Sequence, residues 1–495
     1  MTNPPTNEVR ALKCADCARS DSRVTDLRPT SRVEIPAEAL AGFPDGPPRQ
    51  KSHLNRRSFL RGGVIGMASV YSATHLSWDR IWDAAAADAA AGPNKTVVCI
   101  YLNGGNDGLN TIVPVESSQY AAYLSARGNI ARAIGPSGGG KVGTTVMGGT
   151  GSGLAFANPA VSGAGNNGDS KGFDTLYGDG SGGAGSDLAI FPATDYTPPN
   201  LSHFESRDYW FAGALEQLQT GWLGRWLDRY GSTSNPLQAI SLDSSLSKQI
   251  RSSSAPVCAI ESLSGSGFQI ANTTFNANNL LANLASVPAR PGNDALARSR
   301  SIFGETVDVS NRLRGLSSGA AGAGYPPGSD LSRKLQLAAT LLSAGLGTRI
   351  ITIDWGSFDT HGQQIGSQDP QLSVLSRALG AFKADLATRG VEQNVVTMVF
   401  SEFGRRIGSN DSAGTDHGAG GLVLMSGSSV RGGLAGEHPG VKVNDGEGNL
   451  VPSTDFRSVY QALISEWLGG DPTAVLPGGP FPSVARYDGG NTLMK

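Results

Sequence analysis

Four short polar stretches of this chain carry histidine and carboxylate side chains, the residue types that bind metal ions. Each stretch comes directly after an apolar run or a short distance further along the chain. Imidazole nitrogen and carboxylate oxygen together suit zinc or a similar divalent ion, and two such ions about 3.5 to 4 Å apart can hold the entering and leaving oxygens of an ester displacement. We therefore expect a divalent metal site, for which the candidate ligands are Asp107, Asp359, His361, Glu402, Asp416 and His417.

Ser202 and Arg405 are the candidates for direct action on a substrate. Ser202 lies at the predicted start of a helix, where backbone N–H groups and the helix dipole favour phosphate or sulfate and would assist a nucleophile. Arg405 could orient the anion. Ser202 and Glu205 also form a Ser-x-x-Glu capping box, which the pattern by itself favours over a nucleophile. The two roles are not exclusive.

Each candidate ligand also has a purely structural interpretation. Residues 106–108 (Asn-Asp-Gly) form a common turn sequence. Residues 359–361 (Asp-Thr-His) could start a helix, because Asp and Thr cap helices well. Glu402 could pair with Arg405 to hold a loop, and Asp416 could orient a histidine where no metal is present. The sequence leaves these alternatives open.

The elements that must position these side chains are predicted from apolar runs and helical periodicity. Short β-branched runs predict strands at 95–102, 188–191, 237–242, 349–354, 395–400 and 422–425. Helical patterns fall at 204–230, 330–344, 371–388 and 456–468. Alternating strands and helices predict an α/β fold, a layered and mostly parallel sheet with helices on both faces. Ligands of such sheets collect beyond the carboxyl ends of the strands, where the polar stretches lie.

The front of the chain is typical of an exported bacterial protein. Residues 1–54 are polar, rich in Pro, Arg and Asp, and expected to be disordered. Residues 55–91 then read as a twin-arginine signal, with Arg56-Arg57 before an apolar run that is too short to span a bilayer. Small residues near Ala86 to Ala91 offer cleavage sites. We expect the twin-arginine translocation machinery as a partner, a periplasmic or extracellular location, and no transmembrane segment in the mature chain.

The mature chain, residues 92–495, is expected to be a single α/β domain. Two stretches dense in glycine and serine, near 135–186 and 317–328, are predicted to be surface insertions. A formal net charge of −2 gives no electrostatic case for a nucleic-acid partner. Cys99 lies within a strand-like run and is expected to be a buried, inert thiol.

The ordered motifs resemble a known family. They are 101–111 (YLNGGNDGLNT), 202–204 (SHF), 359–361 (DTH), 401–405 (SEFGR), 414–418 (GTDHG) and 431–436 (RGGLAG). Together they resemble the bacterial domain of unknown function 1501 family over about residues 95–470. Members of that family commonly carry a twin-arginine signal.

That family in turn resembles the alkaline phosphatase and sulfatase superfamily. The resemblance implies an alkaline-phosphatase-like fold, with Asp107 as first metal ligand and Ser202 as nucleophile. It implies one metal site at Asp359, His361 and His417, and a second at Glu402 with Asp107. The expected function is hydrolysis of a small anionic phosphate or related ester by an exported, metal-dependent enzyme. The alternative is a non-catalytic envelope protein, binding or structural, on the same scaffold.

Overall fold

A computed structural model describes residues 69–71, 95–135, 144–147, 153–161, 172–179, 181, 185–262, 316, 324–486 and 489–495. The predicted N-terminal extension and twin-arginine signal lie outside the described residues, except for a short strand at Ser69–Tyr71. Most of the predicted insertion at 317–328 also lies outside them. No described helix is both long and apolar enough to cross a membrane.

A large mixed sheet forms the centre of the described structure. Its order is β1-β8-β7-β9-β2-β10-β13-β6-β14, with β15 also paired to β6. The strands from β8 to β10 run parallel, and β13 lies antiparallel between β10 and β6. The strands are β1 (Ser69–Tyr71), β2 (Thr96–Leu102), β6 (Leu188–Asp195), β7 (Ala239–Ser241), β8 (Val257–Ala259), β9 (Ile350–Trp355), β10 (Val395–Phe400), β13 (Gly421–Ser426), β14 (Gly433–Leu434) and β15 (Thr454–Asp455). This confirms the predicted α/β fold with a mostly parallel sheet.

Strand β2 shows why its apolar run has no polar alternation. Side chains of a strand point alternately to the two faces of the sheet. Val98, Ile100 and Leu102 join the core on one face, whereas Val97, Cys99 and Tyr101 join the core on the other. Both faces are therefore buried. Cys99 is a free, fully buried cysteine, as the sequence predicted.

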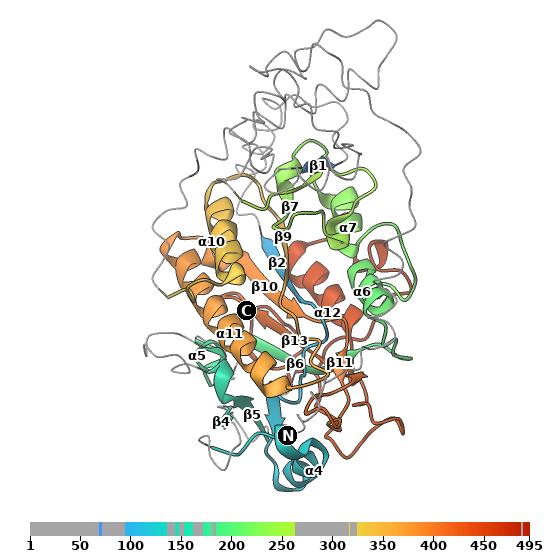
Figure 1. Cartoon of the computed structure of the whole chain (residues 1–495). Coiled ribbons are helices and arrows are strands. Elements are labelled where there is room, and N and C mark those ends of the chain that lie inside the picture. Colours follow the sequence, from blue (N-terminus) through green and yellow to red (C-terminus); the bar gives the residue numbers. More distant parts are fainter. Residues whose placement is uncertain are drawn as a thin grey trace, which may run out of the picture. The chain divides into compact units, whose positions relative to one another are not determined.

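Helices cover both faces of the sheet (Figure 1). One core includes apolar residues of α5 (Phe173–Tyr177), α10 (Asp330–Ser343) and α11 (Gln364–Thr388). The opposite core includes residues of α6 (His203–Ala212), α7 (Trp222–Tyr230), α12 (Phe456–Ala462) and the π-helical turn Leu463–Leu468 that continues it. Helix α4 (Ser117–Arg127) packs in a smaller third cluster.

The single helix predicted over 204–230 was wrong, because the structure has two helices there. Gly213 ends α6 in the left-handed conformation, with φ of 63°. A Cβ at Gly213 would lie 2.8 Å from the Cβ of Trp222, the first residue of α7. Glycine thus allows both the backbone turn and the close approach that a continuous helical pattern does not reveal.

Helix α11 begins seven residues before the predicted start at 371. Pro370 lies inside this helix, although proline is rare inside helices because it lacks an N–H donor. The two turns before Pro370 are held by tertiary hydrogen bonds instead. Gln364 donates to the Asp107 carboxylate at 2.5 Å, and Gln368 donates to the carbonyl oxygen of Asp107 at 3.0 Å.

The glycine-rich stretch at 135–186, predicted to be a surface insertion, contributes to the core at its described residues. A second sheet joins β3 (Ile112–Pro114), β5 (Leu154–Ala157) and β4 (Thr144–Val146). Strand β5 is fully buried, and its Phe156 packs against Phe173 of α5. Glycine content alone does not separate loops from the short strands between them.

Candidate metal centre

Adjacent strands bring the polar stretches to one edge of the sheet. β9, β2 and β10 are parallel neighbours, so their carboxyl ends lie side by side. Asp359 follows β9 and Glu402 follows β10. A two-strand hairpin, β11 (Gly404–Arg405) with β12 (His417–Gly418), then sets Arg405 opposite His417. The segment after β6 leads to His203, which is the first residue of α6.

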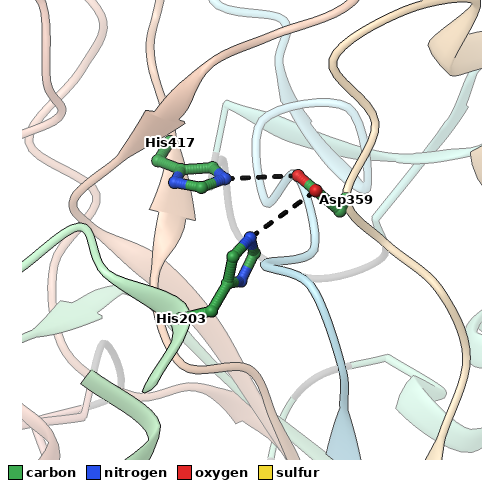
Figure 2. Close-up of side chains that lie close together, drawn as sticks. All are labelled: His203, Asp359 and His417. Atoms are coloured by element: carbon green, nitrogen blue, oxygen red, sulfur yellow. Dashed lines mark hydrogen bonds and ion pairs between the residues drawn. The ribbon is translucent and has the colours of Figure 1, made fainter. Parts of the chain in front are cut away.

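The side chain of Asp359 is the centre of this group. Its Oδ1 lies 3.1 Å from Nε2 of His361 and 3.2 Å from Nε2 of His417, and its Oδ2 lies 3.5 Å from Nε2 of His203. Figure 2 shows His203 and His417 pointing toward the Asp359 carboxylate from different elements. Ligand atoms of His203, Asp359 and His417 all lie within 4.8 Å of one another, a grouping that could hold a metal ion.

Each of the three imidazoles also has an acceptor behind it, on Nδ1. His417 Nδ1 donates to the carbonyl oxygen of Leu201 at 2.9 Å. His361 Nδ1 lies 3.1 Å from Asp416 Oδ1, and His203 Nδ1 lies 2.7 Å from Glu402 Oε1. An acceptor at Nδ1 places the proton there and leaves the lone pair of a neutral ring on Nε2. Histidine ligands of metals have this arrangement.

A cation between the facing Nε2 atoms of His361 and His417 would stabilise their close approach. Nε2 of His361 and Nε2 of His417 are 3.0 Å apart. Two lone pairs at that distance repel unless a proton or a metal ion lies between them. Burial is the main cause that lowers the pKa of His417, so this ring is neutral at pH 7 and offers a lone pair. The donor set of imidazoles and one carboxylate fits zinc or a similar ion.

The charges of the group leave an excess of negative charge. Burial raises the pKa of Asp359, but its contacts with the three histidines and the hydrogen bond from Arg405 outweigh it and hold that pKa well below its ordinary value. Asp359, Glu402 and Asp416 are three carboxylates, and among the described residues only Arg405 brings a guanidinium into contact with them. With neutral imidazoles, a divalent ion would balance the difference.

The negative charge of the neighbouring carboxylates raises the pKa of His203. Burial lowers its pKa, but hydrogen bonds to Asp359 and Glu402 and their charges prevail and raise the pKa to about 9. In the absence of a metal, His203 is therefore protonated at pH 7. A proton and a metal ion compete for its Nε2 atom.

Arg405 positions the carboxylate and does not face a substrate. It is 2% exposed. Its guanidinium donates to Asp359 Oδ1 at 2.8 Å. It also donates to the backbone carbonyls of Gly104, Gly105, Phe358 and Thr415. The predicted role of orienting an anion would require donors that these contacts already use.

Gly104 and Gly105 allow the loop that follows β2 to pass close to the Asp359 cluster. A Cβ at Gly104, which has φ of +109°, would lie 2.4 Å from the backbone nitrogen of Asp359. The N–H groups of Gly104 and Gly105 donate to the Glu402 carboxylate at 2.9 and 3.1 Å. Glu402, fully buried, is thereby held against His203, so it lies behind a histidine and not between the Nε2 atoms.

Asp107 is not brought into this cluster. Both of its carboxylate oxygens bond to Arg127, and Oδ1 also accepts from the N–H groups of Leu109 and Asn110. Asp107 is 1% exposed and Arg127 is fully buried. The structure therefore supports the turn interpretation of residues 106–108, reinforced by a buried ion pair.

The remaining candidates lie at the margin of the cluster. Ser202 occupies the N-cap position of α6, but its side chain makes no capping hydrogen bond, and Glu205 bonds to Asn200 instead. Asp416 contacts His361 and not its neighbour His417. Residues 359–361 do not start a helix, since α11 begins at Gln364.

His203 is absent from the predicted ligand set, although the sequence already groups it with His361 and His417. Only four histidines follow the predicted cleavage site, and these three each lie beside a carboxylate or hydroxyl in a short polar stretch. The structure places Nε2 of His203 3.5 Å from Asp359, so His203 joins the candidate ligands.

Fold and site together define an α/β protein with a histidine and carboxylate centre at the carboxyl edge of a mostly parallel sheet. The chain belongs to the family described as protein of unknown function (DUF1501), which matches residues 197–464. That match covers every residue of the cluster. No curated protein and no solved structure matches this chain.

Removing the acceptor behind His361 tests whether its Nε2 is a ligand. Asp416→Ala should weaken divalent metal affinity by roughly 10- to 100-fold, the usual cost of losing such a partner. The side chain of Asp416 is 51% exposed, so folding should be unaffected. Zinc titration against a competing chelator gives the affinity. Asp411→Ala, an exposed carboxylate in the same loop, is the control. Equal affinity in both variants would remove His361 from the ligand set.

Proposed function

We propose that this protein is an exported, metal-dependent hydrolase of phosphate or related esters. The observation that carries the proposal is the convergence of three Nε2 atoms on Asp359, each imidazole being held from behind on Nδ1. His203, Asp359, His361 and His417 would hold a divalent ion such as zinc. Among the described residues, one cluster of this kind forms, so we propose a single centre instead of the two implied by the superfamily resemblance.

A divalent ion held there would polarise an ester oxygen and lower the pKa of a nearby hydroxyl or water. The chain's own contribution is orientation. Ser202 lies between Leu201, whose carbonyl accepts from His417, and His203. Its backbone is therefore fixed beside the centre, and its hydroxyl is not used as a helix cap. We infer that Ser202 is the nucleophile and that N–H groups at the start of α6 favour the anionic group under attack.

Export through the twin-arginine pathway is part of the same proposal. It is supported by the sequence of residues 55–91 and by the need to assemble a centre from distant segments before secretion. Replacing Arg56 and Arg57 with lysine should leave the precursor in the cytoplasm. Periplasmic protein in normal amounts would argue for another route.

The test of the activity begins with protein purified without chelator. We expect about one divalent ion per chain by elemental analysis, and turnover of at least one ester from a panel of aryl phosphates, phosphodiesters and sulfates. Chelation should abolish turnover and zinc should restore it. Ser202→Ala should retain the ion but lose turnover. A bound ion without turnover on any ester would favour the non-catalytic alternative, and absence of an ion would refute the proposal.

A further inference from the structure

A polar cavity of about 430 Å³ lies beside α6, separate from the histidine cluster. Its volume is within the usual range for small-molecule sites. The lining comes from α6, from the loop that follows it and from residues 245–251, together with Asp354 near the end of β9. The charged residues of the lining are Arg207, Asp208, Lys248, Arg251 and Asp354.

Two of the three cations in this cavity form no ion pair with a described acidic residue. Lys248 pairs with Asp208 at 2.9 Å. Arg207 and Arg251 form no ion pair in the part of the chain that the structure describes. The guanidinium of Arg207 lies 5.7 Å from the centroid of the Phe204 ring. Guanidinium groups bind carboxylate, phosphate and sulfate through paired N–H donors, so the cavity presents free donors for an oxyanion.

Asp354 adds an acceptor to the same cavity. Its Oδ1 atom is buried and has no hydrogen-bond partner. A buried acceptor without a donor is costly, which makes it a candidate for contact with a ligand. Burial raises the pKa of Asp354 to about 7 with help from Asp243, while the positive charge of Arg207 opposes that rise. Arg207 and Asp354 line the same cavity, so both can contact one small molecule bound there.

The cavity and the metal centre share two elements. Arg207 follows His203 by four residues on α6, so the two lie on the same side of the helix, about 6 Å apart along its axis. Asp354 belongs to β9, whose following loop carries Asp359. A substrate of modest length could occupy both places at once.

We propose that this cavity recognises a second anionic group of the substrate, one that carries a hydroxyl or ammonium donor beside it. Arg207 and Arg251 bind the oxyanion, and Asp354 accepts from the neighbouring donor. The substrate class is then an ester with a further phosphate, sulfate or carboxylate group. This assignment of substrate rests on the proposed hydrolase function, whereas the binding site itself does not.

The test measures binding of two probes by calorimetry. Glycerol 3-phosphate carries an oxyanion and hydroxyl groups, and methyl phosphate carries the oxyanion alone. Both are titrated into the full chain and into the Asp359→Asn variant, in which the metal centre cannot contribute. Arg207→Gln and Arg251→Gln should each weaken both probes roughly ten-fold or more, the effect of losing a charge-assisted hydrogen bond. Asp354→Leu, which removes the acceptor oxygens, should weaken glycerol 3-phosphate only.

Arg229→Gln is the matched control, since Arg229 is an exposed arginine of α7 outside the cavity. It should leave both affinities unchanged. Wild-type affinity for both probes in the Arg207 and Arg251 variants would overturn the proposal. Equal loss of both probes in Asp354→Leu would overturn the role of the acceptor. The Asp359→Asn variant should have lost turnover. If both probes still bind to it, the cavity binds anions independently of the metal centre, and this proposal stands even where the hydrolase proposal fails.

Discussion

Replacing Asp359 with asparagine is expected to abolish metal binding at the proposed centre. Asp359 is the residue that contacts His203, His361 and His417 together, and the change removes the charge that attracts the ion. Metal content should fall from about one ion per chain to less than a tenth, and ester turnover should fall by roughly 100-fold or more, because the ion supplies most of the charge stabilisation. Elemental analysis and initial rates give both values.

The control for this change is Asp411→Asn, which removes a charge from an exposed position near the cluster. It should keep both the ion and the activity. If wild-type protein holds no ion and Asp359→Asn leaves its melting temperature unchanged, the cluster is neither a metal site nor a stabilising ionic network. If the melting temperature falls while no ion is found, the group is an ionic network centred on protonated His203.

Replacing Arg127 with methionine is expected to destabilise the domain by about 3 to 5 kcal/mol, the cost of leaving a buried carboxylate without its partner. Arg127 is fully buried and bonds to both oxygens of Asp107, itself 1% exposed. Urea unfolding measures the loss. The double variant Asp107→Asn with Arg127→Met should recover much of it, because the unpaired charge is gone.

The same variants decide between two roles for Asp107. In the structure it is part of an ion pair, so Asp107→Asn should lower stability and leave metal content unchanged. The superfamily resemblance instead makes Asp107 a ligand. Loss of the ion in Asp107→Asn at unchanged stability would support the ligand role and contradict the placement beside Arg127.

Much of the sheet could be predicted, because strands buried on both faces give unbroken apolar runs. Runs at 95–102, 349–354 and 395–400 became β2, β9 and β10, which lie side by side. Their order could not be read from the sequence. The general rule that ligands collect at the carboxyl ends of parallel strands was enough to bring Asp359, Glu402 and His417 to one region.

The roles within that region could not be predicted, since they depend on which atoms face each other. Whether Glu402 contacts a metal or a histidine is decided by two glycine N–H groups on a distant loop. The partner of Asp107 is one helix further along the chain, and no local pattern marks it. The sequence sets His203 apart with the helix start that contains Ser202, and only the structure shows its Nε2 atom facing Asp359.

The centre is assembled from segments far apart in the chain: Leu201 and His417, which share a hydrogen bond, are 216 residues apart. A growing polypeptide therefore completes the proposed ligand set only after His417 has been synthesised and docked. An ion bound there would link early and late segments of the chain. Its presence would indicate that the domain has folded completely.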